Sequence, residues 1–255
     1  MKTGFIGGRL ADSMLGQIGP GGLQGGHCSG QAYDGRSKLE VLLGSGIWDS
    51  LAGKVVVDFG CGSGRDAVEM ASHGARKVIG IDIRPQALAE ARAAADRAGV
   101  GDRCVFATET AERCDVVVTL DGFEHFSDAA GALSFMRGLL RSDGCVLAAF
   151  GPTWFHPFGG HLFSVFPWAH LIFTEASLIR WRSGFKTDGA TRFGEVEGGL
   201  NQMTIRRFKS LVDESAFRFA SFESVPIRRA RLAWNRVTQE FLTSIVRCKL
   251  VPRSP

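Results

Sequence analysis

The sequence predicts an α/β fold built on a mostly parallel β-sheet. The run Val55 to Asp58 is β-branched and ends in an acid, and it is followed by alternating glycines and then by a helical pattern. Further apolar strand patterns alternate with helical ones as far as Phe150, as expected when helices cover both faces of a sheet. A chain of 255 residues can form one domain with an inserted cap.

The expected elements follow in order along the chain. Each strand is a short apolar or alternating run, and each helix has apolar residues three or four positions apart. Strands are expected over residues 55–58, 77–82, 104–108, 115–120, 217–227 and 240–252. Residues 141–150 are expected to hold a turn at Ser142 to Gly144 and then the fifth strand. Helices are expected over residues 37–51, 66–72, 85–99 and 129–140, and from residue 205 onward, where Thr204 caps the helix. The basic run 228–236 reads as a solvated helix or as a surface for an anionic partner.

Composition excludes several classes of protein. A hydrophobic share of 45% and a charged share of 22% are those of a soluble globular protein. The net charge of +4 permits nucleic-acid or membrane binding but does not indicate it, because a dedicated nucleic-acid domain is usually far more basic. The six cysteines show no Cys-x-x-Cys pairing, which indicates a reducing compartment. Without an apolar leader or a run approaching 18 apolar residues, we expect a cytoplasmic protein that does not enter a membrane.

The glycine turn predicts a ligand site. Gly60, Gly62 and Gly64 would let the backbone touch a ligand, because a Cβ would fill the space. The next helix begins there, so its first amides point at the same place. Asp82 lies about 20 residues on, where an acid can hold a ribose. These features also fit a nicotinamide cofactor, because dinucleotide folds have nearly the same turn.

Three features favour another cofactor. Asp58 precedes the first glycine, the spacing is Asp-x-Gly-x-Gly-x-Gly, and the run from Cys114 to Phe126 ends in Asp-Gly-Phe-Glu-His-Phe. Here the chain resembles the class I S-adenosylmethionine-dependent methyltransferases, particularly the small-molecule branch, over residues 50 to 150. The resemblance implies a doubly wound seven-stranded sheet of order 3-2-1-4-5-7-6 whose last strand is antiparallel. It implies S-adenosylmethionine as cofactor, held by Asp58, Gly60, Cys61, Gly62, Gly64, Asp82, Ile83, Glu109, Leu120 and Asp121.

Domain organisation follows from glycine and aromatic content. Residues 1–34 are glycine-rich and are expected to form a flexible arm with no regular element, either a tail or, as in the family, a lid. Residues 35–255 are the methyltransferase domain, in which residues 151–200 are an aromatic and histidine-rich insertion where the family places its substrate cap. This insertion reads as a pocket wall, as a packed hydrophobic subdomain or as a dimer surface. A homodimer is therefore compatible with the sequence.

The candidate catalytic residues are histidines. A hydroxyl or protonated amine acceptor must lose a proton, and histidine titrates near neutral pH. His125 is the first choice for the base, because the resemblance places it and Glu124 at the transferred methyl, and His156 and His161 come next. Each could equally be a structural histidine or a positioning donor. The predicted substrate-binding residues are Tyr33, Glu124, Trp154, His156, His161 and Trp168.

No metal is expected, because the sequence has no compact ligand pair, and His156 and His161 are five residues apart across two glycines. The predicted function is methyl transfer to a small aromatic or apolar molecule, with an oxygen acceptor favoured. N- or C-methylation of a small molecule is the alternative, as is a cofactor-binding scaffold without turnover. A nucleic-acid or protein methyltransferase is disfavoured, since no Asn-Pro-Pro-Tyr motif follows the fourth strand. A nicotinamide-dependent oxidoreductase ranks last.

Overall fold

The computed structural model describes residues 4–18, 35–196 and 198–253, which form a seven-stranded sheet of order β3-β2-β1-β4-β5-β7-β6. The strands are β1 (Val55–Phe59), β2 (Lys77–Ile81), β3 (Cys104–Ala107), β4 (Cys114–Leu120), β5 (Leu140–Phe150), β6 (Phe217–Pro226) and β7 (Thr243–Pro252). Pairings from β3 across to β5 are parallel, whereas β7 runs antiparallel to both β5 and β6. The predicted strand order and the reversed last strand are confirmed, and the sheet is mixed.

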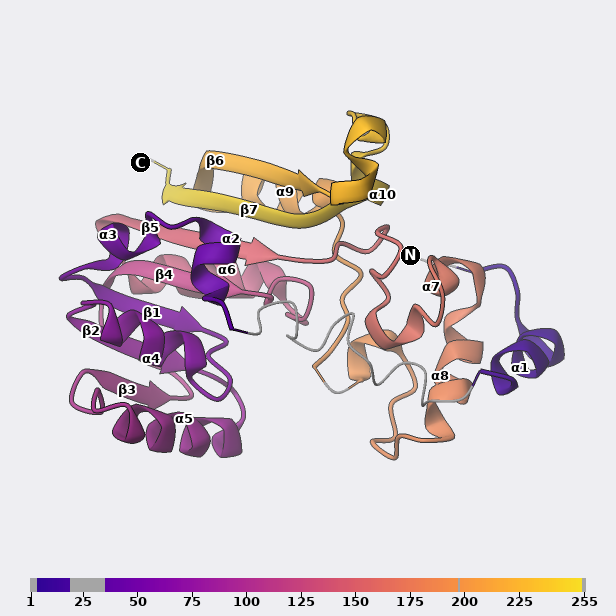
Figure 1. Ribbon diagram of the computed structural model, residues 1–255, viewed down its shortest axis with the longest axis horizontal. Helices are drawn as coiled ribbons and strands as arrows, with labels where there is room; N and C mark the ends of the chain where they lie inside the picture. Colours follow the sequence, from indigo (N-terminus) through magenta and orange to yellow (C-terminus); the bar gives the residue numbers. More distant parts are fainter. Residues whose placement is uncertain (1–3, 19–34, 197, 254–255) are drawn as a thin grey trace.

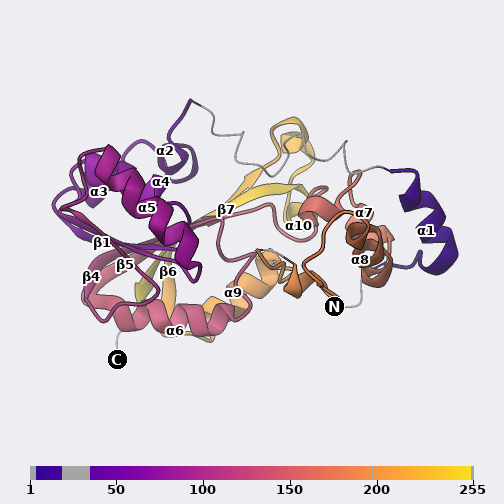
Figure 2. The ribbon, with the colours of Figure 1, turned by 90° about the horizontal axis from the view of Figure 1, so that it is seen from below.

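Helices cover both faces of the sheet. On one face lie α2 (Lys38–Leu43), α3 (Ile47–Leu51), α4 (Arg65–Ser72) and α5 (Pro85–Arg97), and on the other lie α6 (Ala129–Leu139) and α9 (Ile205–Asp213) (Figure 2). Side chains of β1 alternate between the two cores: Val56 packs with residues of α2 to α5, whereas Val55 and Val57 pack with residues of α6 and α9. This is the doubly wound arrangement that the sequence predicts.

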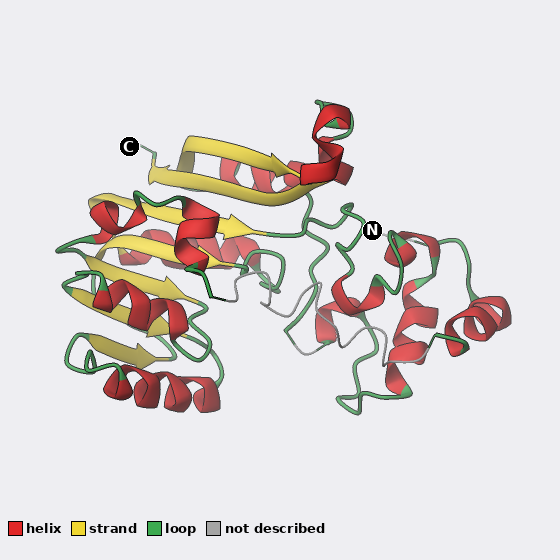
Figure 3. Cartoon of the chain, in the orientation of Figure 1, coloured by secondary structure: helices red, strands yellow, loops and turns green. Residues whose placement is uncertain are grey.

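A cap lies between β5 and α9 and contains η3 (His161–Phe163), α7 (Ala169–Ile172), α8 (Glu175–Ser183) and η4 (Phe193–Glu195). Its own apolar core is built around Trp154, Phe163, Phe173, Leu178 and Phe193. The arrowheads of β1, β4 and β5 point toward the cap (Figure 1), and Figure 3 shows that the cap consists of short helices and loops. The carboxyl edge of the sheet therefore faces the cap.

The expectation that residues 1–34 hold no regular element is wrong for residues 8–16. They form α1 (Gly8–Gly16), which packs beside α8. Ala11 and Leu15 are completely buried in the core of the cap, and Asp12 pairs with Arg180 at 2.9 Å. Tertiary burial thus outweighs the poor helix propensity of the flanking glycines. Tyr33 lies outside the described residues, as do all of residues 1–3 and 19–34 of the predicted arm.

Three further boundaries differ from those expected. The predicted helix 37–51 is split into α2 and α3, because Gly44 takes a φ of 92° between them. The turn expected before the fifth strand is instead part of β5, which carries an irregularity in its register with β4. The last strand begins at Thr243, since α10 (Gln239–Leu242) precedes it, and residues of the basic run form η5 (Arg228–Ala233). None of the described helices is both long and apolar enough to span a membrane.

Candidate active site

The glycine turn after β1 combines open space with tight packing. Gly60, Gly62 and Gly64 have φ angles of +85°, +51° and +79°, a region that L side chains rarely adopt. A Cβ at Gly60 would meet no atom of the described residues within 4 Å, so among these residues the space before it is open to a ligand. A Cβ at Gly64 would lie 2.6 Å from the Cβ of Ala91, which shows that this glycine lets α4 approach α5.

Asp58 carries an unsatisfied carboxyl oxygen beside this turn. The residue is 3% exposed, and its Oδ2 atom has no hydrogen-bond partner among the described residues. Burial and the neighbouring carboxylate of Asp66 raise the pKa of Asp58 to about 8. A buried polar atom without a partner is costly, so the position fits a polar ligand that reaches the end of β1.

Asp82 lies at the end of β2 and is held from two sides. Its Oδ2 accepts the N–H of Gly62 at 2.9 Å, and its Oδ1 accepts the backbone N–H of Arg84 at 2.9 Å and Nε of Arg84 at 3.1 Å. Burial alone would raise the pKa of Asp82, but the hydrogen bonds from Arg84 and Gly62 outweigh it and lower that pKa. Asp82 is therefore a charged acceptor directly beneath the glycine turn.

Lys38 forms ion pairs with two acids at the carboxyl edge of the sheet, and the sequence analysis did not predict it as a site residue. Its Nζ atom lies 3.0 Å from Oδ2 of Asp121 and 3.6 Å from Oδ2 of Asp66. Ser37 fixes the start of α2 by accepting the N–H of Glu40 at 3.1 Å, which places Lys38 in the first turn. The sequence predicts a helix start at Ser37. No sequence pattern near Ser37 indicates that the next residue, Lys38, contacts Asp66 and Asp121, which follow β1 and β4.

The other predicted cofactor residues lie around this edge. Ile83 follows β2 and its side chain is 88% exposed, so it offers an apolar surface. Glu109 is exposed just after β3, and Leu120 is buried at the end of β4. Cys61 belongs to the core of the α2 to α5 face, so only its backbone is available to a ligand. The residues present fit a cofactor that has a ribose and an amino-acid end: Asp82 can accept ribose hydroxyls, and Lys38 with Asp121 offers charges of both signs.

A second hollow lies between the loop after β4 and the cap, with a volume of about 270 Å³. Its lining residues come from these two parts and are His125, Gly160, His161, Leu162, Phe163, Arg182, Lys186, Val196, Gly199 and Leu200. The rings of His125 and His161 face each other with centroids 5.1 Å apart. The structure thus brings together His125, the first-choice base, and His161, one of the cap histidines. We name this hollow the histidine pocket.

The segment that leaves the cap clamps the loop after β4. Asn201 donates its backbone N–H to the carbonyl of Glu124 at 3.0 Å, and its Nδ2 donates to the carbonyls of Phe123 and Phe126 at 2.6 and 2.8 Å. The carbonyl of Gly199 lies 2.8 Å from Nδ1 of His125. A Cβ at Gly199 would lie 2.9 Å from the carbonyl oxygen of His125, so only glycine permits this approach. The sequence offered no signal for this clamp.

Glu124 lies close to His125 and His161 and is buried, with 2% of its surface exposed. Its Oε1 accepts the N–H of Gly151 at 3.2 Å, while Oε2 has no partner among the described residues. Burial and the charge of Asp121 raise the pKa of Glu124 to about 8.

Several predicted substrate residues lie elsewhere. Trp154 is buried in the core of the cap against Phe193, and Trp168 lies on the surface with its indole N–H donated to the carbonyl of Phe155 at 3.0 Å. His156 accepts the N–H of Phe158 at 3.0 Å through Nδ1 and does not line the histidine pocket. Aromatic side chains in the insertion serve mainly to build a core, which is the packed-subdomain alternative.

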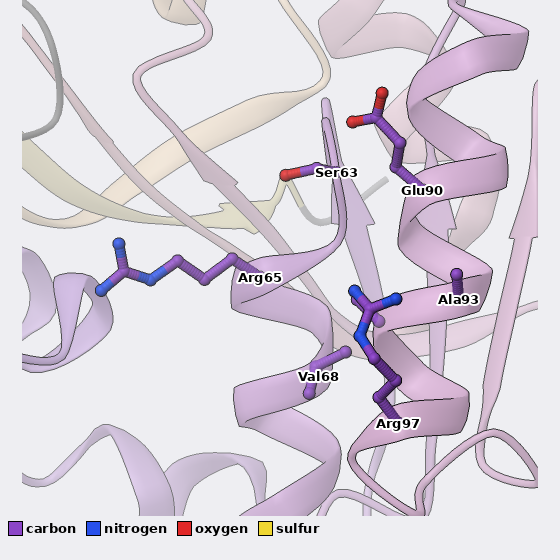
Figure 4. Close-up of a pocket in the computed structure, with 7 residues that line it drawn as sticks. Ser63, Arg65, Val68, Glu90, Ala93 and Arg97 are labelled. Atoms are coloured by element: carbon purple, nitrogen blue, oxygen red, sulfur yellow. The ribbon is translucent and has the colours of Figure 1, made fainter.

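Another hollow, of about 510 Å³, lies between α4 and α5 (Figure 4). Its residues include Ser63, Arg65, Glu90 and Arg97, and none of the predicted site residues lines it. In Figure 4 the Arg65 side chain extends away from α5. This hollow adjoins the glycine turn through Ser63, on the side where α4 begins.

The sheet order and the glycine turn at its carboxyl edge define a Rossmann-like fold. Residues 56–144 match the family model described as a methyltransferase domain. This match indicates S-adenosylmethionine as the cofactor.

Individual relatives share only part of the chain. The ribosomal protein L11 methyltransferase of Shigella sonnei is 57% identical over 53 residues, which are 21% of this chain and 18% of that protein. The chain thus spans about a fifth of the length of the curated relatives it matches.

Solved structures match over a longer range at low identity. The magnesium protoporphyrin IX methyltransferase of Synechocystis PCC 6803 with bound SAH has a TM-score of 0.53 and 19% identity, covering 88% of this chain and 82% of that one. The cyclase SpnF has a TM-score of 0.54 and 13% identity, covering 82% and 81%. At these identities the likeness shows the fold alone.

Proposed function

We propose that the protein transfers the methyl group of S-adenosylmethionine to a small, partly apolar acceptor, with a hydroxyl oxygen as the favoured acceptor atom. The observation that carries the proposal is the histidine pocket, which adjoins the loop that follows β4. Apolar side chains of Leu162, Phe163, Val196 and Leu200 line it together with two imidazoles, the usual composition of a small-molecule site. Its volume of about 270 Å³ suits a small acceptor rather than a protein chain.

Methyl transfer is an in-line displacement. A bond forms between the acceptor oxygen and the methyl carbon while the carbon–sulfur bond breaks, and the sulfonium keeps the electron pair and becomes a neutral thioether. The leaving group needs no proton, so holding the acceptor in line supplies much of the rate. The acceptor hydroxyl must still lose its proton, and the histidine pocket is where that step would occur.

His125 is the residue on which we expect this step to depend. A carbonyl can only accept, so the 2.8 Å contact with Gly199 places a proton on Nδ1 and leaves Nε2 as the acceptor nitrogen. Burial, with His125 nearby, lowers the pKa of His161 to about 3, so this second imidazole is neutral at pH 7 and adds no competing positive charge.

The test begins with calorimetric titration of the protein with S-adenosylhomocysteine, followed by a labelled-methyl screen over phenols, carboxylic acids and amines. We expect binding and label in an oxygen acceptor. His125→Ala should reduce turnover by roughly 10²- to 10⁴-fold and leave S-adenosylhomocysteine affinity unchanged. His73→Ala is the matched control, because His73 stacks on Trp48 at the surface. Equal turnover of the His125→Ala variant and the wild type would remove His125 from the mechanism.

Other outcomes name the alternatives. If the labelled methyl group is found on a nitrogen or a carbon atom, the reaction is N- or C-methylation and the proposed O-methylation is wrong. Cofactor binding without transfer to any acceptor would favour the scaffold protein. Binding of NAD in place of S-adenosylhomocysteine would contradict methyl transfer, because the site around Asp82 would then serve a nicotinamide cofactor.

A further inference from the structure

Three side chains converge where the cap meets the loop after β4. Glu124 and His125 come from that loop, and His161 comes from η3 of the cap. Each of them offers one ligand atom, and these atoms all lie within 4.8 Å of one another. Glu124 and His125 are adjacent in sequence, and His161 lies 36 residues further on. The fold thus builds this group without the compact histidine pair whose absence led us to expect no metal.

Two of these residues have polar atoms left without a partner. Oε2 of Glu124 and Nε2 of His161 are buried, and neither has a hydrogen-bond partner among the described residues. Glu124 is 2% exposed. Leaving a buried polar atom unpaired costs about 1–3 kcal/mol. Two such atoms in residues whose ligand atoms lie within 4.8 Å of each other indicate a missing ligand that both residues can bind.

The third residue is oriented for the same ligand. Nδ1 of His125 donates to the carbonyl of Gly199 at 2.8 Å, which leaves Nε2 with its lone pair. A backbone carbonyl on the other ring nitrogen is the usual partner of a metal-binding histidine. Glu124 is also supported, since the N–H of Gly151 donates to its Oε1 at 3.2 Å and leaves Oε2 to bind.

We propose that Glu124, His125 and His161 bind a divalent transition metal of the zinc or ferrous type. Two imidazoles and one carboxylate suit such ions, whereas magnesium and calcium prefer oxygen ligands alone. Three protein ligands leave at least one coordination position for another group. His125 and His161 also line the histidine pocket, so that position faces the acceptor.

The use of the metal rests on the proposed function, although its binding does not. An acceptor hydroxyl on the metal would release its proton to water at lower pH than a free hydroxyl. The metal-bound oxygen would then attack the methyl carbon. In this arrangement His125 acts as a metal ligand and does not itself take the proton. The ion would also join the cap to the sheet, because its ligands come from both.

The test titrates the full-length, chelator-treated protein with Co²⁺ and follows visible absorption, with Zn²⁺ as a competitor. We expect one equivalent of Co²⁺ to bind and Zn²⁺ to displace it. Glu124→Gln preserves side-chain size and His161→Asn keeps a neutral polar side chain, and each should lower Co²⁺ affinity by more than the roughly 10- to 100-fold that loss of an outer-shell partner costs. His73→Ala should bind like the wild type. Each variant is first shown to bind S-adenosylhomocysteine, which reports a folded sheet.

Thermal unfolding gives a second measurement if either variant folds poorly. Zn²⁺ should raise the melting temperature of the wild type, because it binds only the folded state, and should not raise that of Glu124→Gln. The proposal is overturned if the wild type binds no stoichiometric Co²⁺ or Zn²⁺, or if both variants bind as tightly as the wild type. Metal binding without methyl transfer would sink the proposed function alone. Full methyl transfer in a metal-free protein would sink the catalytic use of the metal.

Discussion

The guanidinium of Arg84 donates two hydrogen bonds to the carboxylate of Asp82, at 3.1 and 3.2 Å. The backbone N–H groups of Arg84 and Gly62 each donate another, at 2.9 Å. A carboxylate has about four acceptor positions, so those of Asp82 are filled. Hydroxyls of a cofactor ribose must therefore displace the Arg84 side chain, which is 64% exposed.

Arg84→Ala should bind S-adenosylhomocysteine more tightly than the wild type, by up to roughly fivefold, because an exposed ion pair contributes about 0–1 kcal/mol and need no longer be broken. Asp82→Ala should instead weaken binding by at least roughly a hundredfold, since two hydrogen bonds to a charged group are lost. Calorimetric titration of both variants checks this. Weaker binding by Arg84→Ala would mean that the arginine contacts the cofactor itself.

Alanine substitutions at glycines of this turn should affect the free energy of unfolding and the binding of S-adenosylhomocysteine to different extents. Gly60→Ala and Gly74→Ala place a Cβ in open space at positive φ, and each should cost about 1–2 kcal/mol of unfolding free energy. Gly64→Ala should cost a further 1–3 kcal/mol or so, because its Cβ would collide with Ala91. Of the Gly60 and Gly74 variants, only Gly60→Ala should also weaken S-adenosylhomocysteine binding. Urea unfolding and calorimetry measure the two effects, and equal binding by these two variants would show that no ligand approaches Gly60.

Asp58 should make stability depend on pH. Its pKa is about 8 in the folded protein and about 4 in an unfolded chain, so the folded state binds more protons between these values. Unfolding free energy should therefore fall as pH rises from about 4 to about 8. Asp58→Asn removes the titrating group, so its unfolding free energy relative to the wild type should be higher at pH 8 than at pH 5. Cofactor-free protein in urea gives this comparison, and an equal difference at both pH values would show that Asp58 is ionised throughout.

Asn201→Ala should loosen the loop after β4. Two hydrogen bonds to the carbonyls of Phe123 and Phe126 would be lost, at a cost of about 1–3 kcal/mol. Turnover should fall because His125 lies in that loop, whereas S-adenosylhomocysteine affinity should hold. Asn235→Ala is the control for turnover, because it also loses two side-chain hydrogen bonds, from the N–H groups of Val237 and Thr238, but in an exposed turn away from the loop after β4. If Asn201→Ala unfolds at the same urea concentration as the wild type, the clamp does not hold the loop.

Periodicity and glycine spacing were sufficient to predict the sheet. β1, β2 and β4 are short runs of buried apolar residues, and such runs can be recognised from neighbouring residues alone. Asp58 and Asp82 could therefore be placed at the ends of strands. The cap could not be predicted in this way, because its short helices are set by packing of Trp154 and Phe173 against distant residues. The helix α1 was missed for the same reason. Contacts of His125 with His161 and Gly199 join segments that are far apart in sequence, and no local pattern encodes them.

The clamp at Gly199 and Asn201 has a consequence for engineering. Substrate range in a capped enzyme is commonly altered by grafting the cap of a relative, which assumes that the cap is an independent module. In this protein the segment that leaves the cap also contacts the loop after β4: the carbonyl of Gly199 orients His125, and the backbone N–H of Asn201 donates to the carbonyl of Glu124. A chimera that receives a foreign cap must therefore keep residues 199–201 from the same parent as the loop after β4, and the second recombination point belongs before Gly199.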